Sequence, residues 1–124
     1  MSVLSRLRLP YARSAVTDDL SAVTSRDSRE VRAGDAGLAA DAAERIWQRT
    51  EALYRTGENP GISLCVRYRG QVILNRAIGH ARGNGPDDDA YAEKIPMQVD
   101  TPVCLFSASK AVTAMLVHWL AQEG

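Results

Sequence analysis

The first regular pattern of apolar and polar positions lies between residues 38 and 56. Apolar side chains recur there at helical spacing, which predicts an amphipathic helix whose buried face carries Leu38, Ala42, Ile46, Leu53 and Tyr54. Asp41 and Glu44 have the spacing of a capping box near the start of this helix. Gly57 and the following Asn59-Pro60 predict its end.

The period of the pattern changes to two after Gly61. Residues 62–68 alternate between larger apolar side chains and Ser, Cys or Arg, which predicts a half-buried strand. Gly70 marks a tight turn, and residues 71–78 return as a second strand. We therefore expect an antiparallel hairpin whose two edges are both open to pairing.

The rest of the chain is a polar connection followed by a strongly apolar segment. The connection spans residues 79–96, and its run Asp87-Asp88-Asp89 is interpreted as a solvated loop, because it lacks the spacing of a metal site. From Ser107 onward apolar residues occupy nearly every side of a helix, which predicts burial. His118 in this helix and His80 after the second strand are interpreted as packed or exposed, since neither has an obvious partner.

Residues 1–36 show no sustained apolar period and predict a flexible leader before a single α+β unit at 37–124. The leader lacks the apolar core of a secretory signal, and its aspartates disfavour a mitochondrial presequence, so the expected location is the cytoplasm. Such a segment does not offset the entropy of ordering it. We therefore expect it to be dispensable and to be cleaved first, at Arg26, Arg29 or Arg32.

Composition and charge narrow the classes of function. The 124 residues carry 15 basic and 15 acidic side chains, and this zero formal net charge argues against a nucleic-acid binder. The apolar runs are too short to span a membrane. Cys65 and Cys104 are too few for a disulfide framework or a four-ligand zinc site, so we expect free, semi-buried thiols.

One short motif suggests chemistry. Ser107-Ala108-Ser109-Lys110 is an S-x-x-K sequence at the start of the last predicted helix. Residues three apart on a helix are neighbours, so a neutral Lys110 amine can take the proton of the Ser107 hydroxyl and activate it as a nucleophile. An apolar environment and a helix N-terminus both disfavour the ammonium form. The motif alone is equally compatible with a surface lysine beside a capping serine.

Two longer runs extend this motif. In TPVCLFSASKAVTAMLVHWLAQEG, a threonine lead and an aromatic residue precede Ser-x-Ser-Lys and an apolar helix. In PGISLCVRYRGQVILNRAIGHARG, a Pro-Gly entry precedes two strands joined at a glycine turn. In this order they resemble the β-lactamase-related serine hydrolases, which include class C β-lactamases and their esterase and DD-peptidase relatives. The matching positions of the first run are Thr101, Phe106, Ser107, Ser109, Lys110, Thr113 and Gly124.

The resemblance implies both a fold and a reaction. The implied fold is the N-terminal portion of the serine β-lactamase/DD-peptidase-like fold: helix, antiparallel hairpin, loop and a buried helix with the S-x-x-K motif. Ser107 would be the acyl-accepting nucleophile and Lys110 its base, and the backbone N–H of Ser107 would form half of the oxyanion hole. The implied substrate is a small-molecule ester or amide, and no metal or organic cofactor is needed. The cytoplasmic expectation favours a carboxylesterase-like hydrolase.

The family's two later motifs have no match in this chain. Neither Tyr-x-Asn nor Lys-Thr-Gly or His-x-Gly occurs at a corresponding place. We therefore expect the hydrolase activity to belong to a longer protein. The competing hypothesis is a truncated, non-catalytic fragment or interaction piece. Two helices and a hairpin offer little cover for the last helix, so we expect part of it to stay exposed and to favour association. No pattern in the sequence specifies an oligomeric state.

Overall fold

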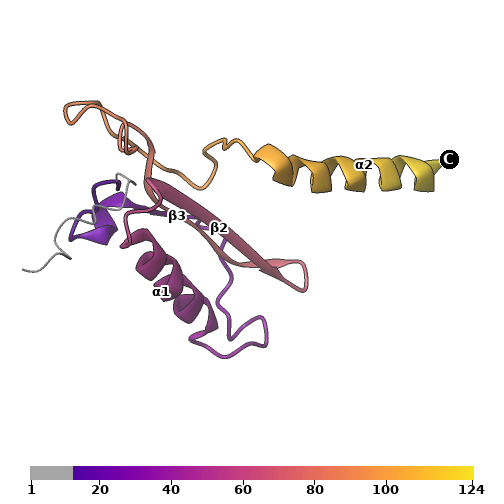
Figure 1. Cartoon of the computed structure of the whole chain (residues 1–124). Coiled ribbons are helices and arrows are strands. Elements are labelled where there is room, and N and C mark those ends of the chain that lie inside the picture. Colours follow the sequence, from indigo (N-terminus) through magenta and orange to yellow (C-terminus); the bar gives the residue numbers. More distant parts are fainter. Residues whose placement is uncertain (1–12) are drawn as a thin grey trace, which may run out of the picture.

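The computed structural model describes residues 13–124 as an α+β body and a projecting helix (Figure 1). The predicted α+β class is confirmed for this stretch, and the first 12 residues of the expected leader lie outside it. The elements are η2 (Leu20–Val23), β1 (Thr24–Arg26), α1 (Ala42–Tyr54), β2 (Gly61–Tyr68), β3 (Gln71–Arg82), β4 (Ile95–Pro96), η3 (Phe106–Ala108) and α2 (Ser109–Glu123).

The predicted hairpin is present as β2 and β3. The strands pair antiparallel through the turn at Arg69-Gly70, whose φ angles of 49° and 80° are the positive values that a two-residue hairpin turn requires. The second strand runs four residues further than expected, so His80 lies within β3. β3 is the central strand of the sheet, between β1 and β2, with β4 on its last residues.

The stretch from residue 13 to residue 36 packs against the sheet, so the expectation of a flexible leader is wrong here. β1 pairs antiparallel with β3, with Ser25 opposite Ala77. After the strand, the backbone N–H of Val31 donates to the carbonyl of Val72 at 2.8 Å. β1 covers an edge of β3 that the hairpin alone would leave open, and among the described residues the outer edges of β1 and β2 are without a strand. A three-residue strand is too short to show a period in the sequence.

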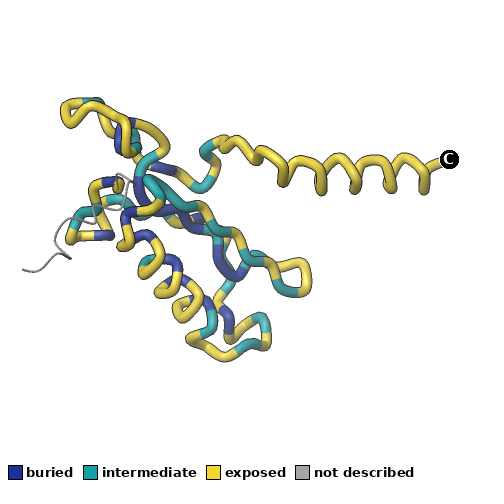
Figure 2. Tube along the Cα trace, in the orientation of Figure 1, coloured by how far each residue is buried: buried dark blue, intermediate teal, exposed yellow. Residues whose placement is uncertain are grey.

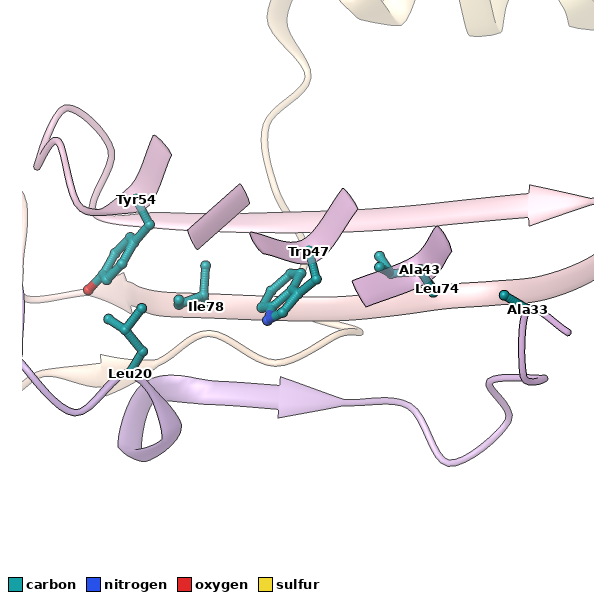
Figure 3. Close-up of a cluster of buried hydrophobic side chains, with 7 residues drawn as sticks. All are labelled: Leu20, Ala33, Ala43, Trp47, Tyr54, Leu74 and Ile78. Atoms are coloured by element: carbon teal, nitrogen blue, oxygen red, sulfur yellow. The ribbon is translucent and has the colours of Figure 1, made fainter. Parts of the chain in front are cut away.

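The hydrophobic core lies between α1 and one face of the sheet (Figure 3). It contains the buried side chains Leu20, Ala33, Ala43, Trp47, Tyr54, Leu74 and Ile78. Trp47 and Tyr54 anchor α1, because aromatic side chains bury the largest apolar area. The predicted helix face was therefore partly wrong: Ile46 and Leu53 are exposed, whereas Trp47 points into the core.

The start of α1 also differs from the expectation. The helix begins at Ala42 with Asp41 as its N-cap, but the Asp41 side chain makes no capping hydrogen bond. Glu44 does not complete a capping box, because its carboxylate accepts hydrogen bonds from Arg76 on β3 instead. A tertiary ion pair has replaced the local motif.

The final helix projects away from the body and is exposed along its whole length (Figures 1 and 2). The predicted helix is present, but its predicted burial is wrong for this structure: none of its residues is buried. The sequence analysis also expected that the other elements would leave part of this helix exposed, and the exposure of the helix agrees with that expectation. Within the described part of the chain, no helix has the length and apolarity needed to cross a membrane.

Candidate active site

Ser107 and Lys110 occupy the same turn, where the chain enters its final helix. Ser107 is the middle residue of η3, and Lys110 is the second residue of α2. Side chains three residues apart nearly eclipse each other in a 3₁₀ turn, so the two residues lie toward one side. Both are exposed, and no hydrogen bond joins them in the described structure. The structure thus brings the predicted pair together without forming the predicted contact.

Phe106 shapes the backbone immediately before the serine. Its φ angle of 46° lies in the left-handed region, which is uncommon for a residue other than glycine. The chain reaches this point without regular secondary structure after Thr101 and becomes helical directly afterwards. Such outliers cluster at functional sites, where the fold holds a residue in a specific orientation. Nothing in the sequence pattern indicated this conformation.

Ser109, the other serine of the motif, has a local structural contact. Its hydroxyl donates a hydrogen bond of 2.7 Å to the carbonyl oxygen of Phe106, bridging the left-handed residue and the first turn of α2. Thr113 donates in turn to the carbonyl of Ser109 at 3.1 Å. The Ser109 hydroxyl is therefore committed to the backbone, whereas the hydroxyl of Ser107 has no protein partner among the described residues.

The N-terminal end of a helix carries a partial positive charge, which stabilises a negative charge that develops at this turn. The first N–H groups of a helix lack intrahelical acceptors and carry a partial positive charge. Ser107 is the second residue of the helical stretch 106–123, and no acidic residue lies in the first turn of η3 or α2. The N–H groups of Ala108 and Ser109 already donate to backbone carbonyls, so an oxyanion at Ser107 would gain the partial positive charge of the helix start and not a set of free donors.

The surface of α2 beside Lys110 is open to solvent. It also includes Ser109, Thr113 and His118, but not Ser107. His118 is exposed, which agrees with one of its two sequence interpretations. All of these residues belong to one exposed helix, so the surface beside Lys110 has no opposing wall.

A comparison with protein-family models matches residues 20–124 to the beta-lactamase family. The chain belongs to the beta-lactamase family. The match runs from η2 to the end of α2, so it includes the N-terminal strand as well as the S-x-x-K motif. No curated protein and no solved structure gives a match. Family membership confirms the resemblance without assigning a role to any residue of this chain.

One histidine and two cysteines of this beta-lactamase family member are the other potentially reactive groups considered. His80 lies on β3 with its Nδ1 atom buried and without a hydrogen-bond partner. Burial lowers the pKa of His80, and the nearby Lys94 lowers it further. Cys65 and Cys104 are free, as expected, but both are exposed, so the expectation of semi-buried thiols is wrong.

The acidic loop behaves as a solvated segment. Asp87, Asp88 and Asp89 are exposed, and the last two accept backbone N–H groups of Gly85 and Tyr91 within the loop. Among residues 13–124, no group of three or more His, Cys, Asp or Glu side chains is placed to hold a metal ion.

Proposed function

We propose that Ser107 is the nucleophile and Lys110 the general base of a serine hydrolase that cleaves a small-molecule ester or amide. The observation that carries this proposal is the placement of both residues on one exposed turn, with Ser107 free of a hydrogen-bond partner while Ser109 is bound to Phe106. Membership in the beta-lactamase family supports the assignment to a hydrolase.

The proposed reaction passes through an acyl-enzyme. The Ser107 oxygen attacks the carbonyl carbon while its proton moves to the neutral Lys110 amine. The bond to the leaving group then breaks, and the leaving oxygen or nitrogen takes a proton as it departs. Water attacks the new ester, releasing the carboxylic acid and restoring the Ser107 hydroxyl. Neither a metal ion nor an organic cofactor takes part in these steps.

The base in this reaction requires desolvation. A lysine accepts a proton only as the neutral amine, and removal from water favours that form. Lys110 is exposed on α2. Acylation uses this base, so its rate depends on a surface that covers this side of the helix, and an exposed Lys110 supports only slow acylation. The expected cytoplasmic location favours a carboxylesterase-like substrate.

The exposure of α2 favours a second candidate function, a non-catalytic interaction piece. In that case Lys110 is a surface lysine and Ser107 is a residue of the helix start. The absence of a hydrogen bond between them in the described structure is compatible with this role. The two candidates differ in one property that is simple to measure: only the hydrolase forms a covalent adduct at Ser107.

The test is labelling of the purified chain with a fluorophosphonate probe, followed by intact mass and peptide mapping. Because full activity is expected of a longer protein and Lys110 is exposed, we expect slow labelling of this chain that does not exceed one adduct and lies at Ser107. Ser107→Ala and Lys110→Ala should each remove most of the labelling, and the double variant should lose little more, because two residues that perform one step are not additive. Ser109→Ala is the matched control and should keep at least about half of the labelling rate.

Two outcomes would contradict the hydrolase proposal. Labelling that survives Ser107→Ala but disappears in Ser109→Ala would show that Ser109, and not Ser107, is the nucleophile. A chain that stays unlabelled under conditions that label a known serine hydrolase would support the interaction piece instead.

A further inference from the structure

The last residues of β3 are held by a segment that returns from the polar connection. The chain leaves the sheet after β3 and comes back to it at β4, where His80 lies opposite Pro96 (Figure 1). The backbone N–H of Met97 then donates to the carbonyl of Gly79 at 2.9 Å. A two-residue strand that contains proline makes few backbone bonds, because proline has no N–H. The return segment 93–97 is therefore weakly held, as is typical of regions that open locally.

The return segment lies close against the end of β3. Gly83 has a φ of 81° and leaves no room for a side chain beside the backbone of Glu93 and Lys94. Met97 is buried, and its carbonyl accepts a hydrogen bond of 3.2 Å from the hydroxyl of Ser25. A charge that appears in this contact therefore has little water around it.

His80 places an ionisable ring in the same contact. The residue is half-buried, and its Nδ1 atom is buried without a hydrogen-bond partner in the protein. A neutral imidazole carries its proton on one nitrogen only, so Nδ1 can remain an unprotonated acceptor. The imidazolium carries an N–H on both nitrogens, so protonation puts a buried donor without an acceptor at Nδ1. The folded arrangement therefore favours the neutral ring.

The basic and phenolic groups around this end of β3 do not offset the charge of an imidazolium. Burial lowers the pKa of His80, and the positive charge of Lys94 on the return segment lowers it further. Arg82, on β3 itself, is also cationic. α1 contributes Tyr54, whose pKa is raised by burial, so its phenol stays neutral. η2 and the first four residues of β2 carry no ionisable side chain.

The acidic residues of the elements packed here are exposed and do not bind the ring. Asp19, the N-cap of η2, accepts hydrogen bonds from Ser21. Glu58 lies in the turn before β2, and Glu93 precedes the lysine of the return segment. Within the described part of the chain, no carboxylate makes an ion pair with His80. Protonation of the ring is therefore uncompensated in the folded arrangement.

We infer that His80 is a pH-sensitive switch at the end of β3, whose protonation releases segment 93–97 from the sheet. In the released state the ring is in water and away from Lys94, so both nitrogens of the imidazolium find acceptors. Release exposes one buried side chain, that of Met97, whereas α1 and the hairpin are held by the core. Mild acid thus opens this end of the sheet without unfolding the body.

The direction of the pH effect follows from proton binding. A histidine in water has a pKa of about 6.5, and a folded pKa below that value means that the released state binds more protons. Release therefore becomes more favourable as the pH falls below about 6.5, until the pH reaches the folded pKa. A single group changes the release equilibrium by at most about tenfold per pH unit in this window.

The experiment is hydrogen exchange of the full chain, measured amide by amide from about pH 7.5 to about pH 5.5, which lies above the titration of the carboxylates. Each rate is divided by that of an unstructured peptide at the same pH. We expect the protection of the Met97 N–H to fall by about fivefold to tenfold over this range. The Val31 N–H, which donates to Val72 at the other end of β3, is the reference and should change less than about twofold.

Two variants and one titration identify the responsible group. His80→Gln has a polar side chain that does not titrate, so the protection of Met97 should be the same at both ends of the pH range. His118→Gln is the matched control, because it removes the other histidine of the chain, on α2, and should leave the fall in protection unchanged. An NMR titration of the His80 ring in the wild-type chain needs no variant and should give a midpoint below about 6.5.

Four results would overturn the inference. A ring midpoint at or above about 6.5 would show that the folded arrangement does not favour the neutral ring. Protection of Met97 that is constant with pH in the wild type would show that the segment is not released. A fall that persists in His80→Gln would assign the response to another group. An equal loss of protection at Val31 would show unfolding of the body instead of local release. Ser107 and Lys110 are unchanged in both variants, so the labelling test remains independent.

Discussion

The guanidinium of Arg76 and the carboxylate of Glu30 form a bidentate ion pair beneath the N-terminal segment. Arg76 Nε and Nη2 each lie 3.0 Å from a Glu30 oxygen, and both side chains are almost fully buried. Glu44 of α1 binds the same guanidinium, and the Trp47 ring lies 5.6 Å from its central carbon. Arg76 therefore joins the N-terminal segment and α1 to the central strand.

The two acidic partners of Arg76 should contribute unequally to stability. Breaking a buried ion pair leaves an uncompensated charge, so we expect Glu30→Gln to lower the free energy of unfolding by about 3 kcal/mol. The Glu44 side chain is 53% exposed, and Glu44→Gln should cost about 1 kcal/mol or less. Urea denaturation of the two variants measures this difference. Equal losses would show that burial of Glu30 does not determine its contribution.

Acid should destabilise the body through carboxylates that are bound in the folded state. Hydrogen bonds from the Arg29 side chain and backbone, and from Asn75, hold the pKa of Asp27 well below its usual range. Hydrogen bonds from Arg76 likewise lower the pKa of Glu44. A carboxyl with a lowered folded pKa contributes stability above its unfolded pKa of about 4 and loses it as the pH falls toward the folded value. The unfolding midpoint should therefore decline below about pH 4.

Asp27→Asn should reduce this acid dependence. The variant removes one group that binds protons on unfolding, so its stability should be lower near neutral pH and should fall less steeply below about pH 4. Asp87→Asn, in the exposed loop, serves as the control and should leave the profile unchanged. Parallel profiles for the wild type and Asp27→Asn would mean that Asp27 is not held ionised by its partners.

Two glycines with positive φ should respond very differently to alanine. A Cβ at Gly79, where φ is 90°, would lie 2.6 Å from Cε2 of the buried Tyr54 and still closer to the carbonyl oxygen of Pro60. We expect Gly79→Ala to cost about 3 kcal/mol or more. Gly70 has a φ of 80° but open space around it, so Gly70→Ala should cost only about 1 kcal/mol. Thermal unfolding of the two variants tests this order.

The N-terminal segment should prove necessary for the fold. Leu20 is 7% exposed and belongs to the core, so Leu20→Ala should lower the free energy of unfolding by about 3 kcal/mol. Leu53 is 47% exposed on α1, and Leu53→Ala should cost less than about 1 kcal/mol. The denaturant midpoints of the two variants and the wild type test this difference. A Leu20→Ala variant as stable as the wild type would show that the N-terminal segment does not contribute to the core.

Local patterns were sufficient to predict several elements of this chain. The alternation at residues 62–68 and the glycine at position 70 predicted the hairpin, because strand period and turn conformation depend on neighbouring residues. The S-x-x-K spacing likewise predicted that Ser107 and Lys110 share a turn. The resemblance to a serine hydrolase family depended on the same residues, and the family match over residues 20–124 confirms it.

Contacts between distant residues decided the rest. β1 is a strand because β3 pairs with it, and the carboxylate of Glu30 is buried because Arg76 lies 46 positions further along the chain. Trp47 rather than Ile46 faces the core because of the way α1 packs on the sheet. The sequence by itself determined the helix of residues 109–123 and its apolar character. The sequence predicted that part of this helix would stay exposed, and only the tertiary structure showed that none of its residues is buried, because burial depends on the surface that surrounding elements offer and not on the helix alone.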